Sequence, residues 1–394
     1  MTRTCPLSSG TFYTKALVIT TNIFIAMRIK RLSYKDIITG WNISNMEFSK
    51  FTLLVGASGV GKTQILKAIQ NLAAISRGRS GNGIEWNVLF NVDGVDYEWA
   101  GAFSPDEGEY ARIVHKKTPS IPVVYEILKK EEEIIVNRDE NGIMFRETRT
   151  VKLEPTQSII YLLKEEDEIQ PIYDGFLNIT KLDNTLSRVS FSAGKVFDQA
   201  KVESFEDVRK MRFLYPIDKL FMLYKFNLPE FEEIKQDFHS VFPSVTDIRF
   251  TIENALEDIS SPVLQIKEDG VSQWILYQNI SSGMLRTLSQ LVLLKLAKGG
   301  DVVLIDEFEN SLGVNCIDEV AESILDLDED VQFIITSHHP YIINSISYEK
   351  WRIVTRQGCD VSVHTAEELG IGAHSNHERF MQLVQLSAYK TGKI

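Results

Sequence analysis

Cysteine is scarce in this chain. Its 394 residues include three cysteines, Cys5, Cys316 and Cys359, which lie far apart and form no C-x-x-C pair. An odd number of widely spaced cysteines argues against a disulfide framework, and it offers too few thiolates for a structural zinc site. This usage is typical of a reducing compartment, and we expect a cytoplasmic protein.

An excess of positive charge is also missing. Lys and Arg number 42 against 54 Asp and Glu, which gives a formal net charge of −12. Such a balance disfavours non-specific attraction of the whole surface to nucleic acid or acidic membranes, but it does not exclude a local basic groove. The apolar stretch at residues 16–26 is too short to span a bilayer, so we expect no membrane partner.

Residues 1–26 have two interpretations. Their basic residues followed by an apolar run superficially resemble a secretory signal. Met27 then opens "MRIKRLSYKDI", which could itself start a protein. Because a protein of the reducing cytoplasm should not be exported, we interpret residues 1–26 as a poorly ordered N-terminal extension. Whether they belong to the native protein is left open.

The remaining composition is that of a large folded protein, with 44% hydrophobic and 24% charged residues. Short continuous apolar runs such as "VVLI" and "FIIT" are typical of strands buried on both faces of a parallel sheet. Asp93-Gly94 and Asn141-Gly142 predict β-hairpins. We therefore expect an α/β fold with an antiparallel β subdomain. The predicted segments are an N-terminal lobe at 27–180, a helical insertion at 181–262 and a C-terminal lobe at 263–394.

The stretch "GASGVGKT" carries the clearest chemistry. It follows the apolar run at 51–55 and precedes a helix-like pattern, as the phosphate-loop motif G-x-x-x-x-G-K-[ST] requires. Glycines let backbone N–H groups surround a phosphate, the lysine reaches the β/γ oxygens, and the threonine hydroxyl ligates Mg²⁺. The predicted nucleotide-binding residues are Gly56, Ala57, Ser58, Gly59, Val60, Gly61, Lys62 and Thr63. ATP and Mg²⁺ are the expected cofactors.

A second acidic element completes the predicted site. The run "VVLI" ends at Asp306-Glu307. We expect Asp306 to hold the metal together with Thr63, and Glu307 to activate the attacking water as a catalytic residue. The second carboxylate favours a hydrolase over a small-molecule kinase.

The order of these motifs resembles the ABC-type ATPase head of the RecF/OLD-like branch. "ISSGMLR" at residues 280–286 precedes "DVVLIDEFENSL", and "FIITSHHP" follows. The resemblance covers residue 27 to about residue 355 and implies a P-loop NTPase fold. It implies that Ser281 and Gly283 cap the γ-phosphate of ATP on a neighbouring subunit. It also implies that His338 is the catalytic switch histidine, with His339 as a one-residue alternative.

Two features depart from the pattern of that family. The glutamine that senses Mg²⁺ is hard to place, and Gln157 in "PTQSIIYLL" is the candidate metal ligand. In the D-loop segment, which includes Ser311, the usual His-Pro is replaced by Gly313-Val314. The geometry of that segment is therefore left open.

What the ATP energy is used for follows from resemblance alone. The chain has no long coiled coil, and the segment after the switch histidine is too short for a TOPRIM nuclease. It resembles the ATPase subunits of the two-gene PARIS anti-phage systems. That resemblance implies a homodimer or higher oligomer, a separately encoded TOPRIM-type nuclease as effector and a phage protein as trigger. The alternative is a RecF-like repair ATPase that clamps duplex DNA, for which basic residues at 28–35 could line a groove.

Overall fold

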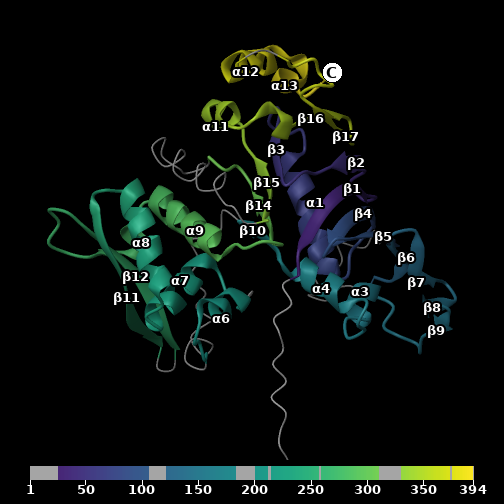
Figure 1. The fold of residues 1–394 in the computed structure, drawn as a ribbon, viewed down its shortest axis with the longest axis horizontal. Helices are drawn as coiled ribbons and strands as arrows, with labels where there is room; N and C mark the ends of the chain where they lie inside the picture. The colour runs from purple at the N-terminus through teal and green to yellow at the C-terminus, as the bar shows by residue number, and fades with distance from the viewer. Residues whose placement is uncertain are drawn as a thin grey trace, which may run out of the picture.

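The computed structural model describes residues 25–105, 121–182, 200–211, 214–256, 259–309, 330–372 and 375–393. Fourteen of the described strands form one mixed sheet (Figure 1). In their order across the sheet, these strands are β10 (Ile179–Leu182), β14 (Val302–Ile305), β15 (Gln332–Thr336), β3 (Phe51–Val55), β16 (Trp351–Gln357), β17 (Asp360–Thr365), β2 (Asn42–Glu47), β1 (Met27–Asp36), β4 (Ile84–Val92), β5 (Val95–Phe103), β6 (Val123–Lys130), β7 (Glu133–Asp139), β8 (Gly142–Phe145) and β9 (Thr148–Arg149). The predicted mixed α/β fold is confirmed.

The first five strands of that order are parallel and carry the deepest core. Strands β3, β14 and β15 are buried at every position. Their side chains alternate between two apolar clusters: Leu54 faces the cluster that contains α1 (Lys62–Ile75), while Leu53 and Val55 face the opposite one. Because β15 lies between β3 and β14, the carboxyl ends of these strands meet at one edge.

The other half of the sheet is antiparallel, and its hairpins follow the turn chemistry of the sequence. Asp93 and Gly94 join β4 to β5 with φ values of 50° and 86°, the left-handed pair that a tight two-residue hairpin needs. Trp86 and Trp99 stack edge to face in the core beneath. The short helix α3 (Ile159–Leu162) and α4 (Gln170–Leu177) pack beside these strands (Figure 1).

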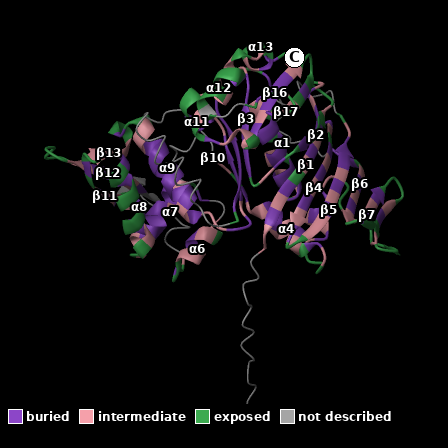
Figure 2. Ribbon diagram, turned by 45° about the horizontal axis from the view of Figure 1, so that its top comes forward, coloured by how far each residue is buried: buried purple, intermediate pink, exposed green. Residues whose placement is uncertain are grey.

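A second unit stands beside the parallel edge of the sheet and has its own apolar core (Figure 2). The predicted helices appear in it, but the region also holds a long strand pair, because β11 and β12 pair over most of their length. The core continues past residue 262 through Leu296. Its elements are α6 (Phe205–Lys210), α7 (Pro216–Lys225), α8 (Pro229–Val241), β11 (Val245–Leu256), β12 (Ile259–Glu268), β13 (Ile275–Leu276) and α9 (Ser282–Leu296).

Three helices near the C-terminus cover the sheet face opposite α1. They are α11 (Pro340–Ser345), α12 (Asn376–Gln385) and α13 (Ser387–Thr391), and each contributes to the same cluster as Leu53. Gly392 follows the last residue of α13 and lies against the loop at residues 56–63. A Cβ at this glycine would lie 2.3 Å from a methyl carbon of Val60. The Gly392 carbonyl also accepts a hydrogen bond from the Arg356 backbone N–H.

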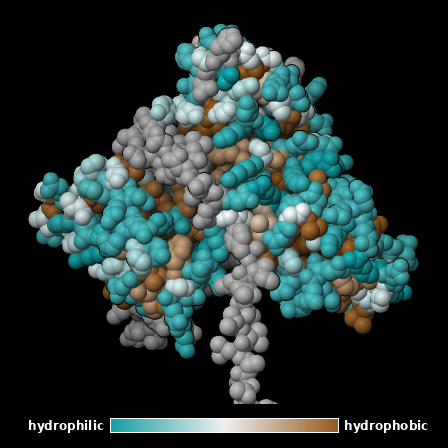
Figure 3. Space-filling model, viewed as in Figure 1, coloured by the Kyte–Doolittle hydropathy of each residue, from teal (hydrophilic) through white to brown (hydrophobic). Residues whose placement is uncertain are grey.

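The outer surface shown in Figure 3 is mostly hydrophilic, with apolar side chains scattered over it. In the described part of the chain no helix is both long enough and apolar enough to cross a membrane. Residues 1–24 of the predicted N-terminal extension at 1–26 fall outside the described residues, as do Ser311 and Gly313-Val314.

Candidate nucleotide-binding site

The loop after β3 is built from glycine conformations. Gly56, Gly59 and Gly61 have φ values of 144°, 83° and 110°, where side chains are strained. At Gly56 a Cβ would also meet the Val354 carbonyl oxygen of β16 at 2.5 Å. The sequence therefore folds this stretch into a backbone-lined turn that opens directly into α1. The start of a helix offers unpaired N–H groups and a positive dipole end, which suits a phosphate.

Lys62 is held at the centre of this loop. Its ammonium donates to the carbonyl oxygens of Gly56 at 2.7 Å and Ala57 at 2.9 Å. An ammonium has three donors, so one remains for another acceptor. Burial lowers the pKa of Lys62, while the charges of Glu309, Asp306 and Glu307 act in the opposite direction. The lysine is thus a positioned cation that faces a group of carboxylates.

A chain of hydrogen bonds joins the loop to the acidic end of β14. The Thr63 hydroxyl donates to Asp306 Oδ1 at 3.1 Å, and the Thr336 hydroxyl donates to the same oxygen at 2.8 Å. The Glu307 backbone N–H in turn donates to Thr336 Oγ1 at 2.7 Å. Thr336, the last residue of β15, therefore ties both acidic residues together. The sequence analysis missed it, because its role depends on β15 lying between the other two strands.

The oxygens of Thr63 and Asp306 fit a magnesium ion. Mg²⁺ prefers hard oxygen ligands, and it usually takes one or two from the protein and the rest from phosphate and water. Within the described ranges no cluster of three His, Cys, Asp or Glu residues could hold a metal by itself. A hydroxyl and a carboxylate 3.1 Å apart beside a phosphate loop match a metal that arrives together with a nucleotide.

Lys181 is a further neighbour of Asp306. It lies on β10, its side chain is 7% exposed, and its ammonium is 3.9 Å from Asp306 Oδ2. The parallel pairing of β10 with β14 places Lys181 opposite Leu304, two residues before Asp306. The sequence contains no local signal for this pairing, since more than a hundred residues separate the two strands.

Gln157 lies elsewhere. Its carbonyl accepts a hydrogen bond from Arg138, and it precedes Ser158, the N-cap of α3. The Tyr161 ring of α3 touches Gly78, beyond the last residue of α1, whereas the phosphate loop precedes the first residue of that helix. The 14 residues of α1 span about 21 Å at 1.5 Å per residue. Gln157 is therefore not placed to share a metal with Thr63 and Asp306, and Lys181 lies beside Asp306 instead.

Glu307 has an unusual backbone. Its φ is 47°, in the left-handed region that non-glycine residues seldom adopt. Its N–H is held by Thr336, and its carbonyl accepts a hydrogen bond from Arg286 Nη2 at 2.9 Å. A backbone fixed from both sides in a sparsely populated conformation is a common feature of functional residues.

Helix α9 presents two different surfaces. Ser281 is its exposed N-cap and accepts a hydrogen bond from the Met284 N–H at 3.2 Å. Arg286, one turn further, is buried and reaches the carbonyl oxygens of Asp306 and Glu307 at 3.0 and 2.9 Å. Ser281 thus caps the helix, and the buried arginine links this helix to the acidic segment.

Ser281 and Gly283 are not part of the chain's own phosphate loop. Helix α9 contributes Leu293 and Leu294 to the cluster on one face of the sheet, whereas α1 packs on the other face. Figure 1 shows the two helices on opposite sides of β14 and β15. Ser281 and Ser282 in the first turn of α9 are exposed.

The two histidines after β15 differ in their surroundings. The His338 side chain is 59% exposed and its Nδ1 lies 2.7 Å from Glu309 Oε1. His339 is half-buried, is the N-cap residue of α11 and donates its N–H to the Ser337 hydroxyl at 3.1 Å. Of the pair, His338 has the exposed ring.

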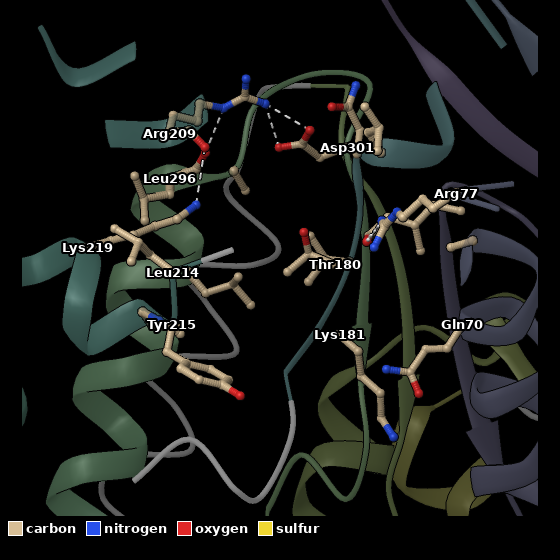
Figure 4. A pocket seen from close by; sticks show the side chains of 18 of the residues that line it. Gln70, Arg77, Thr180, Lys181, Arg209, Leu214, Tyr215, Lys219, Leu296 and Asp301 are labelled. Atoms are coloured by element: carbon tan, nitrogen blue, oxygen red, sulfur yellow. Dashed lines mark hydrogen bonds and ion pairs between the residues drawn. The ribbon is translucent and has the colours of Figure 1, made fainter. Parts of the chain in front are cut away.

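A separate cavity of about 570 Å³ lies between α1 and β10 on one side and α6, α7 and α9 on the other. Figure 4 shows Gln70 and Arg77 facing Leu214 and Tyr215 across it. Arg209 at its edge donates to both carboxylate oxygens of Asp301, at 2.8 and 2.7 Å. No phosphate-loop residue lines this cavity, so we do not assign it to the nucleotide; it marks the junction of the sheet with the second unit.

Solved structures of other proteins are similar to this chain. Two similar solved structures are an Smc head bound to the C-terminal winged-helix domain of ScpA (16% identity, TM-score 0.45, covering 86% of this chain and 97% of that one) and an Smc head with an extended coiled coil bound to the C-terminal domain of ScpA derived from Pyrococcus furiosus (13%, 0.44, 87% and 98%). No curated protein matches the chain.

A family model matches residues 51–344, which is most of the chain. The matched region begins with β3 and ends in α11, so it contains the phosphate loop, Asp306, Glu307 and His338. The chain therefore belongs to the family described as "AAA domain, putative AbiEii toxin, Type IV TA system".

Proposed function

We propose that this protein hydrolyses ATP with the help of Mg²⁺ and uses ATP to join copies of itself. The observation that carries this proposal is the hydrogen-bonded series Thr63–Asp306–Thr336–Glu307, which links a phosphate loop to the fixed backbone of a second acidic residue.

Each residue of the site has a separate role in ATP binding or hydrolysis. Lys62 offers its third donor to a phosphate oxygen, and the loop N–H groups bind the same anion. Thr63 and Asp306 hold the metal, and Glu307 accepts a proton from the attacking water. When bound, Mg²⁺–ATP supplies the γ-phosphoryl group and a cation that offsets the negative charge formed during transfer.

The same site is completed from a second copy. The first turn of α9 begins with the exposed Ser281 and includes the partly exposed Gly283, and its helix N–H groups are suited to an anion. Because α9 and α1 pack on opposite faces of the sheet, we assign this turn to the γ-phosphate bound by a partner subunit. ATP then holds two subunits together and hydrolysis separates them.

The Glu307→Gln variant tests the enzymatic part. An amide keeps the shape of the side chain but cannot accept the water proton, so ATP should still bind while turnover falls at least about 100-fold. The readouts are nucleotide affinity by calorimetry and steady-state phosphate release. We expect the variant to accumulate as an ATP-bound oligomer on size exclusion. Phosphate release at the wild-type rate would remove Glu307 from its assigned role.

We further propose that the ATP-driven assembly controls a separate effector in anti-phage defence, a TOPRIM-type nuclease released by a phage trigger protein. Support comes from the motif wording shared with the RecF/OLD-like branch, including that of PARIS ATPase subunits, and from the family's description as part of a toxin–antitoxin system. This step rests on analogy between families.

Affinity purification of the tagged protein from its own cells tests the effector. We expect a nuclease to co-purify with the Glu307→Gln variant in ATP and to dissociate on addition of the trigger. Binding of duplex DNA by the isolated protein is the alternative outcome. Tight binding of DNA by the isolated protein, weakening steeply with salt, would favour a repair clamp and contradict the effector proposal.

A further inference from the structure

Glu309 is a buried carboxylate that the proposed roles do not yet use. It lies three residues beyond Asp306 and is 9% exposed. Its Oε1 accepts a hydrogen bond from the His338 backbone N–H at 2.9 Å and lies 2.7 Å from His338 Nδ1. Its Oε2 is buried without a hydrogen-bond partner in the described part of the chain. A buried polar atom left in this way is costly and calls for an explanation.

The pairing fixes which nitrogen of His338 carries a proton. Glu309 Oε1 already accepts the backbone N–H of His338, so this oxygen is placed as an acceptor for the ring nitrogen 2.7 Å away. Nδ1 therefore bears hydrogen, and in the neutral ring Nε2 keeps its lone pair. Because the backbone N–H of the same residue binds the same oxygen, the ring and the main chain are oriented together.

The contact between Glu309 and His338 also joins the two segments that follow neighbouring strands. Glu309 follows β14, whose last residues lead into Asp306 and Glu307, and His338 follows β15. Their strands pair in parallel, so the carboxylate reaches the histidine across the sheet edge where the phosphate loop lies. The charge of Glu309 is also felt at Lys62, whose pKa it raises against the effect of burial.

We propose that Glu309 is a positioning residue for ATP hydrolysis, which holds His338 in the Nδ1–H form and directs Nε2 to the γ-phosphate or the attacking water. This inference rests on the proposed function. The His338 side chain is 59% exposed, so Nε2 is available to a nucleotide shared between two copies. A carboxylate that orients a histidine in this way serves the histidine's chemistry without touching the reacting atoms.

The first test observes the histidine directly, without nucleotide. Nitrogen-15 NMR of histidine-labelled protein at about pH 8.5, where an ordinary imidazole is neutral, reports which nitrogen is protonated. We expect His338 to be the Nδ1–H tautomer in the wild type. We expect the same form in Glu309→Gln, whose amide oxygen still accepts, and a largely Nε2–H form in Glu309→Ala. Glu126→Gln is the control, because Glu126 is a buried carboxylate bound to Ser158 at the far end of α1.

The second test distinguishes a role of Glu309 in positioning the His338 ring from a role in stabilising the local backbone alone. Glu309→Ala should lower kcat about 10-fold or more with little change in KM for ATP, and Glu309→Gln should recover part of the loss. The Glu309→Ala and His338→Ala losses should not add in the double variant, because each removes the same function. An unprotonated wild-type Nδ1, an unchanged tautomer in Glu309→Ala or additive losses would each overturn the proposal. Wild-type protein with no ATPase activity but the expected tautomer would instead contradict the proposed function alone.

Discussion

At the residue scale, the phosphate loop depends on one lysine. Lys62→Ala removes the ammonium held by the Gly56 and Ala57 carbonyls, so we expect ATP affinity to fall at least about 10- to 100-fold, the equivalent of one or two charge-assisted hydrogen bonds. Isothermal titration measures the loss. Lys67→Ala, an exposed position on the same helix, is the matched control and should bind normally. Wild-type affinity in Lys62→Ala would refute the loop assignment.

Thr336 offers a more specific test, because its hydroxyl contacts both acidic residues at once. Thr336→Val keeps the size and branching of the side chain but leaves Asp306 and the Glu307 N–H without this partner. We expect a loss of about 1–3 kcal/mol in unfolding free energy and at least about a 10-fold fall in turnover. Thr355→Val on β16 is the control, since Thr355 is equally buried but binds only β17 groups. Equal turnover in the two variants would contradict the role of Thr336.

Which of these residues the sequence could predict depends on how local their signals are. Lys62 and Thr63 are set by a contiguous motif, and Asp306 and Glu307 by the end of an apolar run. Thr336 and Lys181 gain their roles from strands that pair across long stretches of chain, so no spacing rule identifies them. Gln157 was predicted from its order in the chain alone; it precedes α3, whose Tyr161 lies against Gly78 beyond the last residue of α1.

At the scale of elements, Arg286 connects α9 to the acidic segment that follows β14. Arg286→Leu keeps an apolar stem but loses both bonds to the Asp306 and Glu307 carbonyls. We expect a clear fall in the thermal midpoint and a loss of phosphate release that exceeds the loss of ATP binding. The control is Lys295→Leu on the same helix, which removes a part-exposed pair with Glu233 and should cost little. Normal turnover in a folded Arg286→Leu protein would show that α9 does not position the acidic segment.

Helices were predicted correctly where the spacing of apolar residues and the residues at the helix ends indicated the same element. The helix-like pattern after the phosphate loop forms α1, which buries Ile65, Leu66, Ile69, Leu72 and Ala73. Helix α9 begins after Ser281 and ends before Gly299-Gly300. Between residues 245 and 256, however, a segment interpreted as polar and helical forms β11, because pairing with β12 over its length outweighs weak local preference.

At the scale of the whole molecule, the order of strands was beyond the reach of the sequence. The alternation of strands and helices predicts a parallel core, but the position of β15 between β3 and β14 creates the line from Thr63 to Glu307. The same arrangement puts α1 and α9 on opposite faces. A single chain therefore carries a phosphate loop and an exposed helix start that do not meet each other.

The separation of these two surfaces leads to a mixing experiment. If Ser281 and Gly283 complete the site of a neighbouring copy, Ser281→Arg should spare ATP binding and block hydrolysis, because it fills the turn that approaches the γ-phosphate. A Lys62→Ala subunit has the opposite lesion. In a mixed dimer one shared site carries both changes and the other carries neither, so mixing two inactive proteins should restore up to about a quarter of wild-type activity, by random pairing into dimers with one intact site. Phosphate release from each protein alone and from the mixture measures this.

Two outcomes decide between a shared and a self-contained site. Ser281→Arg that is fully active by itself would refute the shared site, because the first turn of α9 would then have no part in hydrolysis. Ser281→Arg that fails to bind ATP would mean that the substitution acts within its own subunit, against the separation of α9 from the phosphate loop on the two faces of the sheet. Restored activity in the mixture requires contact between copies, since neither chain alone holds both an intact Lys62 and an intact Ser281. Dilution of the mixture should then abolish activity faster than it reduces ATP binding, because hydrolysis depends on the encounter of two subunits while the loop of each binds its nucleotide alone.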